Sequence, residues 1–488
     1  MLYQSTRSSY VTDDVHALLT GLAPDGGLFV DPALGAGAFD WRECLRLPPL
    51  GMASMLLRHL LPGITEMDEL VRRAYSGKFS RDELTPLVPV GDQYVLELFH
   101  GPTSAFKDVA LSMLPQLIRA ARGQLGETGA TLILTATSGD TGKAALEGFH
   151  DVEGTRIVVF YPENGVSDVQ RKQMVTQKGN NVSVCAVRGN FDDCQRGVKL
   201  AFSHLRERSD LHLSSANSIN IGRLAPQLVY YFIAYARLLG MGRISLGDRV
   251  DYVVPTGNFG DILAGYMAKR LGLPVGRLVC ASNANRVLTD FFRSGVYDRR
   301  RDFVRTSSPS MDILVSSNLE RLLFYAFHGD TDAVSAAMTK LDTEGCYAVD
   351  GAVMDALRED FAAFCCSEEE TAETIGKVYR RCGYVCDPHT AVAFHAAERY
   401  CAEAGGCAPL VVLSTASPYK FPGRILQSLG QSVPENEFDQ MDALHELSRI
   451  PIPANLASLR TAEEIHLDVI DRDRICAYVE NAAKGDKR

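Results

Sequence analysis

From residue 83 onward the chain alternates short apolar runs with longer helical stretches, and this alternation limits the possible folds more than any other feature. The runs have the length and apolar content of buried strands. Strands are predicted at residues 95–99, 131–137, 156–162, 182–187, 252–256, 278–283 and 409–415. Helices are predicted at residues 106–122, 142–150, 167–178, 192–207, 222–239 and 260–271. The pattern predicts an α/β fold with mostly parallel sheets, and so many strands favour two lobes.

The segments on either side of this region differ from it in character. Residues 1–82 combine a turn-rich stretch, APDGGLFVDP, with helical material, which predicts a separate N-terminal α+β domain. Residues 83–435 form the predicted main domain, with a small lobe at about 106–245. Residues 436–488 are charged, and we expect them to form a helical C-terminal extension that packs on the surface.

Composition excludes several classes of partner. With 488 residues and 46% hydrophobic content, the chain can bury one large core or two to three smaller ones. A formal net charge of -10 without a long Lys/Arg run argues against a nucleic-acid or acidic-membrane partner. No apolar run reaches about 18 residues, and the N-terminus lacks a basic segment followed by an apolar one. We therefore expect a cytoplasmic protein.

The cysteine pattern does not predict a metal centre. Cys365 and Cys366 are adjacent, and Cys382 and Cys386 lie four apart, so neither pair is a CxxC motif matched by a second one. We expect the 12 cysteines to be reduced thiols.

Lys107 is the first candidate for chemistry. It lies in LELFHGPTSAFKDVALSML, where a strand ends near Phe99, Gly101 and Pro102 turn the chain, and a helix begins. Asp108 suits the N-terminus of that helix. A lysine held at such a junction and partly desolvated has a lowered pKa and can bond covalently to an aldehyde. The alternative is an ordinary surface lysine, and the pattern around Lys107 alone does not exclude it.

Two glycine loops each follow a predicted strand and precede a predicted helix. In the first, residues 257–261 read GNFGD, and glycines there let backbone amides approach a phosphate. The loop lacks the GxGxxG pattern of dinucleotide sites, and an ordinary turn remains the alternative. In the second, residues 138–142 read SGDTG and suit a carboxylate or a phosphate. It is not an ATP-binding P-loop, because the required glycine and hydroxyl positions hold Thr137 and Ala144.

Six motifs in order over about 320 residues resemble those of the threonine synthase family. They are HGPTSAFKD (100–108), TSGDTG (137–142), NSINIGR (217–223), GNFGD (257–261), DPHTAVA (387–393) and LSTASPYKF (413–421). LAPDGGLFV (22–30) is similar to the family's N-terminal domain. The resemblance implies a two-lobed fold-type II pyridoxal-phosphate (PLP) enzyme, related in fold to the tryptophan synthase β subunit.

The resemblance also implies roles for particular residues. Lys107 would be the catalytic residue and would hold PLP covalently. Thr415 would face the pyridine nitrogen, and the cofactor phosphate would bind to Gly257, Asn258, Phe259, Gly260 and Asp261. Substrate-binding residues would be Ser138, Gly139, Asp140, Thr141, Ser218, Asn220 and Arg223. No metal site is implied.

The reaction implied by the resemblance converts O-phospho-L-homoserine and water to L-threonine and phosphate. With three anionic groups to bind, the net-negative chain needs local cations, for which Arg223, Lys143 and Lys420 are candidates. The chain departs from the family at Ser417, where many members have histidine. His389 has either a structural role or an acid–base role. Two alternatives stay open: a phospho-lyase that releases 2-oxobutyrate, and a non-catalytic amino-acid-binding relative. We expect a monomer or a homodimer.

Overall fold

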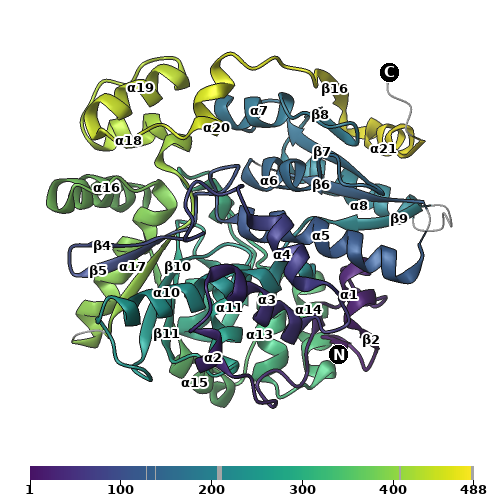
Figure 1. Cartoon of the computed structure of the whole chain (residues 1–488), viewed down its shortest axis with the longest axis horizontal. Coiled ribbons are helices and arrows are strands. Elements are labelled where there is room, and N and C mark those ends of the chain that lie inside the picture. The colour runs from purple at the N-terminus through teal and green to yellow at the C-terminus, as the bar shows by residue number, and fades with distance from the viewer. Residues whose placement is uncertain (128, 138, 206–210, 406–407, 485–488) are drawn as a thin grey trace.

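Two mostly parallel β-sheets organise the chain. The computed structural model describes residues 1–127, 129–137, 139–205, 211–405 and 408–484 (Figure 1). The larger sheet has the strand order β14-β11-β10-β15-β5-β4, and all of its pairs are parallel except β4 with β5. Its strands are β4 (Leu87–Val90), β5 (Gln93–Glu97), β10 (Val250–Pro255), β11 (Val275–Ser282), β14 (Phe361–Cys365) and β15 (Leu410–Ser414).

The second sheet has the strand order β16-β8-β7-β6-β9, and every pair in it is parallel. Its strands are β6 (Ala130–Ala136), β7 (Thr155–Pro162), β8 (Val182–Arg188), β9 (Leu211–Ser215) and β16 (Asp468–Asp471). All seven strands predicted from the sequence are present in these two sheets. The predicted α/β fold with two lobes and mostly parallel sheets is confirmed.

Helices cover both faces of each sheet, as parallel sheets require. In β10, Tyr252 and Val254 face a core shared with α5 (Lys107–Leu125), α10 (Leu228–Gly240) and α11 (Gly260–Arg270). Val253 between them faces the opposite core, against α17 (Pro388–Ala404). The second sheet divides likewise, and α8 (Phe191–Leu205) and α21 (Ile475–Lys484) cover its outer face. Strand alternation thus places each side chain in one of two cores.

The remaining helices connect these layers. They are α6 (Asp140–Phe149), α7 (Asp168–Val175), α9 (Ile221–Leu224), α12 (Val287–Ser294), α13 (Leu319–Ala326), α14 (Thr331–Glu344), α15 (Gly351–Asp360), α16 (Glu368–Cys382) and α18 (Pro422–Ser428). The helix predicted over 222–239 is interrupted. A 3-10 turn at Ala225–Gln227 separates α9 from α10, because Pro226 has no N–H to continue the α-helical ladder.

The N-terminal segment packs onto the main body. It contains the antiparallel sheet β2-β1-β3, formed by β1 (Leu2–Ser5), β2 (Val11–Asp13) and β3 (Phe29–Val30). Its helices are α1 (Asp14–Thr20), α2 (Trp41–Cys44), α3 (Pro49–Leu60) and α4 (Met67–Tyr75). Glu320, a buried residue of α13, accepts from the Thr6 hydroxyl at 2.5 Å and pairs with Arg7 at 2.8 Å. These contacts fix the segment beside the larger sheet.

The C-terminal segment contains α19 (Glu437–Ser448), α20 (Ala454–Ala457) and α21, which agrees with the expected helical character. It also contributes β16, which the sequence did not predict. This strand pairs in parallel with β8, and α21 then packs against α8 (Figure 1). The segment is therefore part of the second lobe and not only a surface cover.

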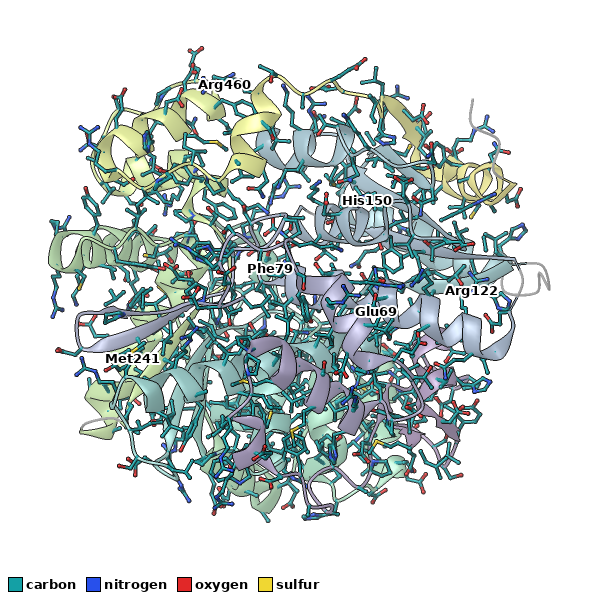
Figure 2. All side chains as sticks on the ribbon, viewed as in Figure 1. Glu69, Phe79, Arg122, His150, Met241 and Arg460 are labelled. Carbon is teal, nitrogen blue, oxygen red and sulfur yellow. The ribbon has the colours of Figure 1, made fainter. Side chains whose placement is uncertain are left out.

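Arg122 anchors the end of α5 to the second sheet (Figure 2). Its guanidinium donates to the carbonyls of Gly129 and Gly154, the residues that precede β6 and β7. It also lies 3.5 Å from Glu127. A buried arginine thus uses its planar set of donors to align one helix with two strands.

Within the described residues, ten cysteines carry free thiols and Cys401 is disulfide-bonded, so the expectation of reduced thiols fails at that position.

A small sheet of β12 (Val296–Asp298) and β13 (Cys346–Ala348) completes the strands. No helix in the described part of the chain is long and apolar enough to cross a bilayer.

The contact between α5 and α6 yields a stability prediction. A Cβ added at Gly148 would lie 2.0 Å from the carbonyl oxygen of Leu111, and backbone there has little room to move. We expect Gly148→Ala to lower the free energy of unfolding by about 1–3 kcal/mol. Gly123→Ala is the matched control, because that position in α5 has nothing within 4 Å. It should stabilise by about 0.5–1 kcal/mol in urea denaturation. Equal effects of the two substitutions would contradict this packing.

Candidate active site

One cavity of about 1320 Å³ lies where the carboxyl ends of strands from both sheets meet helix N-termini. Thr137 after β6, Thr256 after β10 and Thr415 after β15 line it, together with the first residues of α5, α6 and α11. This edge of parallel sheets is where α/β proteins bind ligands, because strand ends and helix starts leave backbone groups unpaired.

Lys107 is the first residue of α5 and points into this cavity. Its side chain is 9% exposed, and its Nζ donates to the Ser310 hydroxyl at 3.2 Å. Burial lowers the Lys107 pKa to about 8; Asp140 opposes the shift, while nearby Lys420 and Arg223 add to it. This amine is therefore more often uncharged near neutral pH than an ordinary lysine, and an uncharged amine is nucleophilic.

The loop before Lys107 is held by Asp108. Its carboxylate accepts from the backbone N–H of Thr103 at 2.8 Å and from the Thr103 hydroxyl. A Cβ at Gly101 would lie 2.4 Å from Asp108 Cβ, which explains why glycine occupies that turn. Burial raises the pKa of Asp108 to about 6, although the hydrogen bonds from Thr103 oppose that shift. Asp108 thus lies in the first turn of α5, as the sequence predicted, and its carboxylate also shapes the loop.

Thr415 lies beside this loop. Its carbonyl accepts from the backbone N–H of Phe106 at 2.8 Å, and Ala105 pairs with Ala416 in an antiparallel bridge. These bonds fix the end of β15 next to Lys107. The side chain of Thr415 lines the cavity and is nearly buried.

The GNFGD loop lines the cavity, and two of its carbonyls are used within the protein. The carbonyl of Gly257 accepts from the Ser316 hydroxyl at 2.7 Å, and that of Asn258 accepts from the Asn318 backbone N–H at 3.1 Å. Phe259 adopts a left-handed φ of 62°, which turns the chain into α11. A Cβ at Gly257 would lie 2.7 Å from the carbonyl oxygen of Ser310. The loop thus makes a cradle at a helix N-terminus, a place suited to an anion.

Asp261 lies in the first turn of α11, but its carboxyl group turns away from the cradle. It accepts from the hydroxyl groups of Tyr230 at 2.5 Å and Tyr231 at 3.2 Å. Burial raises the pKa of Asp261 to about 7, and the two tyrosine hydroxyls oppose this shift. A carboxyl group that is partly protonated at neutral pH repels a neighbouring phosphate less than a full charge would.

The SGDTG loop opens α6, where Gly139 adopts a φ of 149° that favours glycine. Gly139, Asp140 and Thr141 line the cavity, while Ser138 lies outside the described residues. Asp140 forms a buried ion pair with Lys420 at 2.5 Å and accepts from Gln170 at 2.9 Å. Burial alone would raise the Asp140 pKa, but Lys420 and Lys107 hold it well below its usual range. The pair links the two lobes and cancels the charge of Asp140.

Arg223 is a buried cation without a carboxylate partner among the described residues. One of its terminal nitrogens donates to the carbonyl of Ala216, and its Nε is buried without a hydrogen-bond partner. Burial lowers the Arg223 pKa to about 10, and Tyr230 opposes that shift. An unpaired buried guanidinium that lines a cavity is suited to an anionic ligand.

The other two candidate residues of the NSINIGR segment, Ser218 and Asn220, also line the cavity. Their side chains already bond to protein groups. Asn220 caps α9 by accepting from the Gly222 N–H at 2.8 Å and donates to the Leu18 carbonyl at 2.9 Å. The hydroxyl of Ser218 accepts from Asn318 at 3.1 Å.

Ser310 and the contact it makes with His389 were not anticipated from the sequence. The backbone N–H of Ser310 donates to His389 Nε2 at 3.2 Å, and His389 Nδ1 lies 2.7 Å from Asp387. Because a backbone N–H only donates, Nε2 accepts and Nδ1 carries the proton. Asp387 caps α17, the structural role that the sequence also allowed. The hydrogen bonds from Asp387 through His389 to Ser310 thus position the hydroxyl that accepts from Lys107. The sequence around Ser310, SSPSMD, is polar but has no pattern that predicts this role.

Three residues discussed from the sequence behave differently. Lys143 was a candidate cation for the substrate, but it pairs with Glu147 at 2.9 Å and does not line the cavity. Lys420 is neither solvated nor a cavity-lining residue, because it is buried against Asp140. Ser417, at the position of the family histidine, caps the short turn at Pro418–Lys420.

Comparison with known proteins places these residues in a family. Residues 84–416 match the model of the pyridoxal-phosphate dependent enzymes, and residues 390–476 match the C-terminal model of threonine synthase. A threonine synthase from Pseudomonas aeruginosa is 40% identical, over 95% of this chain and 94% of its own length. A Threonine synthase-like 1 protein from Pongo abelii is 38% identical over 96% of this chain, but the match covers only 64% of that protein.

Solved structures give the same result. The crystal structure of PLP-bound threonine synthase from Brucella melitensis has a TM-score of 0.88, 38% identity and full coverage of both chains. With these matches, the chain belongs to the threonine synthase family of pyridoxal-phosphate-dependent enzymes.

Proposed function

We propose that this chain is a threonine synthase, which converts O-phospho-L-homoserine and water to L-threonine and phosphate. One observation carries the proposal: two groups that are suited to anions line the same cavity as Lys107. They are the amides of the GNFGD loop and the unpaired guanidinium of Arg223. The enzyme of this reaction must bind the cofactor phosphate and an anionic substrate on either side of a nucleophilic lysine.

The residues present fit PLP. The cradle at Gly257–Asp261 would hold the cofactor phosphate, Lys107 would hold its aldehyde carbon, and Thr415 would meet the pyridine nitrogen. When bound, PLP supplies the conjugated system that takes up electron density from the substrate's Cα. A hydroxyl at the pyridine nitrogen, instead of a carboxylate, leaves that nitrogen less firmly protonated.

Arg223 and the start of α6 would bind the anionic groups of the substrate. The N-terminus of α6 supplies positive potential, although the Gly139 amide already donates to the Thr137 hydroxyl at 3.0 Å. Asp140 does not cancel this potential, because Lys420 neutralises its charge. Ser138 and Ser218 belong to the same proposed set, and Asn220 would act by holding α9, and with it Arg223, in place.

Lys107 would move the protons of the reaction. The Cγ–O bond to phosphate breaks, the hydroxyl of water adds at Cβ, and protons leave and return at the carbon chain. Nζ has a pKa of about 8, so it can accept and release protons near neutral pH. Ser310 and His389 would hold this amine when it is free, since Nζ already donates to the Ser310 hydroxyl.

The proposed function carries further expectations. The partner is a small-molecule substrate and not a nucleic acid or membrane, the protein acts in the cytoplasm, and it is a monomer or a homodimer. We propose the domain limits 1–82, 83–435 and 436–488, with a small lobe at about 106–245, and β16 joins the last segment to that small lobe.

The first prediction concerns the product. Purified protein supplied with PLP and O-phospho-L-homoserine should release phosphate and threonine in equal amounts, measured by chromatography of the amino acid. The Threonine synthase-like 1 relatives favour testing a second outcome on the same scaffold, in which 2-oxobutyrate and ammonia appear instead. That result would show that the chain is a phospho-lyase and not a threonine synthase.

The second prediction concerns Lys107. Protein with bound PLP should show a visible absorption band, and Lys107→Ala should lose both this band and at least about 10³-fold of the activity. Lys143→Ala is the control, because Lys143 pairs with Glu147 outside the cavity. It should keep the band and most of the activity. A band that persists in Lys107→Ala would disprove the assignment of the lysine.

The third prediction concerns the Asp140–Lys420 pair. Lys420→Met leaves the buried carboxylate of Asp140 without its cation and should lower the free energy of unfolding by about 3–5 kcal/mol. Adding Asp140→Asn removes the stranded charge, so the double variant should regain much of that loss. Urea denaturation of the four proteins measures the coupling. Strictly additive losses would mean that the two groups do not stabilise each other.

A further inference from the structure

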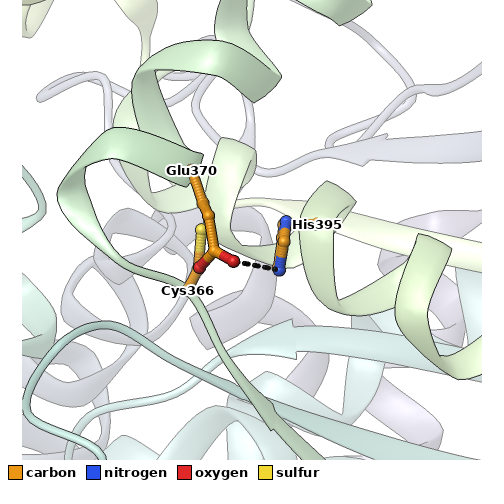
Figure 3. A group of neighbouring side chains, drawn as sticks. All are labelled: Cys366, Glu370 and His395. Atoms are coloured by element: carbon orange, nitrogen blue, oxygen red, sulfur yellow. Dashed lines mark ion pairs between the residues drawn. The ribbon is translucent and has the colours of Figure 1, made fainter.

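A second cluster of chemically active side chains lies away from the cavity. Cys366 follows β14, Glu370 lies in the first turn of α16, and His395 lies on α17. The Cys366 sulfur, a Glu370 carboxylate oxygen and a His395 ring nitrogen all lie within 4.8 Å of one another. Figure 3 shows the three side chains converging from these separate elements. None of the three lines the active-site cavity.

One ring nitrogen of this cluster has no hydrogen-bond partner among the described residues. His395 Nε2 is buried and has no hydrogen-bond partner, and its 3.7 Å separation from the nearer Glu370 oxygen exceeds hydrogen-bond length. A buried ring nitrogen left unpaired costs about 1–3 kcal/mol. The unmet nitrogen faces a carboxylate oxygen and a sulfur, which are both ligands for a metal ion.

The surrounding residues orient the ligands as metal sites require. One Glu370 oxygen accepts from the Ser367 N–H at 2.8 Å in a capping box, which leaves the other oxygen directed toward His395. The Thr371 hydroxyl lies 3.3 Å from the Cys366 sulfur and donates its own proton to the Ser367 carbonyl at 2.7 Å. Glu368 and Glu369 in the same turn offset the positive potential of the helix N-terminus.

The donor set selects the metal. Sulfur, imidazole nitrogen and carboxylate oxygen together suit Zn²⁺, which binds them at about 2.0–2.3 Å in tetrahedral geometry. Neighbouring ligand atoms then lie about 3.3–3.8 Å apart, so the cluster needs to contract by only about 1 Å. The Glu370 side chain is 42% exposed, which gives water access to the fourth position.

We propose that Cys366, Glu370 and His395 form a Zn²⁺ site that ties the end of β14 and the start of α16 to α17. The site goes beyond the proposed function, which requires no metal. Binding would brace α17, the helix whose first turn carries Asp387 and His389 at the active site. The sequence did not predict it because its ligands are 4 and 25 residues apart and form no CxxC pattern.

A reactive cysteine is the competing explanation. Burial raises the pKa of the Cys366 thiol to about 12, and the Thr371 hydroxyl only partly opposes this. Without a cation the sulfur is therefore a protonated thiol, which is a poor nucleophile.

The test measures zinc binding by the PLP-loaded full chain after removal of metal with a chelator. Competition with a chromophoric chelator should give one tight equivalent of Zn²⁺. Cys366→Ser and His395→Gln should each weaken binding at least about tenfold. Cys365→Ser is the matched control, because the neighbouring Cys365 is outside the cluster, and it should bind Zn²⁺ as the parent does.

A second variant and a second readout separate ligand loss from misfolding. Glu370→Gln can keep the capping box, since glutamine serves at that position, but it loses the anionic ligand. It should fold with unchanged circular dichroism and bind Zn²⁺ more weakly. Co²⁺ in the parent should show the intense red-region bands of a tetrahedral site, where PLP does not absorb. The site would be overturned if the parent bound no tight equivalent of Zn²⁺, or if Cys365→Ser lost as much Zn²⁺ affinity as Cys366→Ser. Threonine formation is assayed separately and tests the proposed function alone.

Discussion

The desolvation of the Lys107 amine is the constraint on which the rest of the site depends. A lysine buried at a helix start is tolerated only if its charge is lowered or compensated, and here both occur. Asp140 compensates it through space, but Asp140 is itself neutralised by Lys420 at 2.5 Å. Arg223 then adds a cation with no carboxylate partner in the described structure. The cavity therefore carries excess positive potential inside a chain of net charge -10.

That local excess explains how an acidic protein can bind several anions. The carboxyl groups nearest the GNFGD cradle and the Lys107 loop are Asp261 and Asp108, and burial raises the pKa of both. Each also accepts hydrogen bonds from hydroxyl or backbone donors. The overall charge of the chain thus says little about the site, because buried groups titrate far from their usual values.

The two-sheet architecture brings these groups together from distant parts of the chain. Lys107, the GNFGD loop and Thr415 each stand at the junction between a strand of the larger sheet and the element that follows it. The SGDTG loop stands at the same kind of junction in the second sheet. Because β15 lies between β10 and β5, residues more than 300 positions apart in sequence become neighbours, as the bond from Phe106 to Thr415 shows. The Asp140–Lys420 pair then holds the two lobes against each other.

Local patterns in the sequence were enough for the seven main strands, the helices that alternate with them and the loops that line the cavity. Strands and their glycine turns are encoded within short windows, and six motifs in fixed order identified the family. The interruption at Pro226 was not predicted, although proline acts on its own turn and the break was therefore readable. The edge strand β16 was not readable, because its pairing with β8 depends on a partner almost 300 residues away.

The sequence by itself determined which residues could do chemistry: a lysine at a helix start, two glycine loops after strands, and an arginine beside them. Only the tertiary structure decided which of them act together. It buried Lys420 against Asp140, used Lys143 elsewhere, and set Ser310 and His389 behind Lys107. It also brought Cys366, Glu370 and His395 within 4.8 Å. The physical reason is that burial, pKa and partner choice depend on distances across the fold, and spacing along the chain does not carry that information.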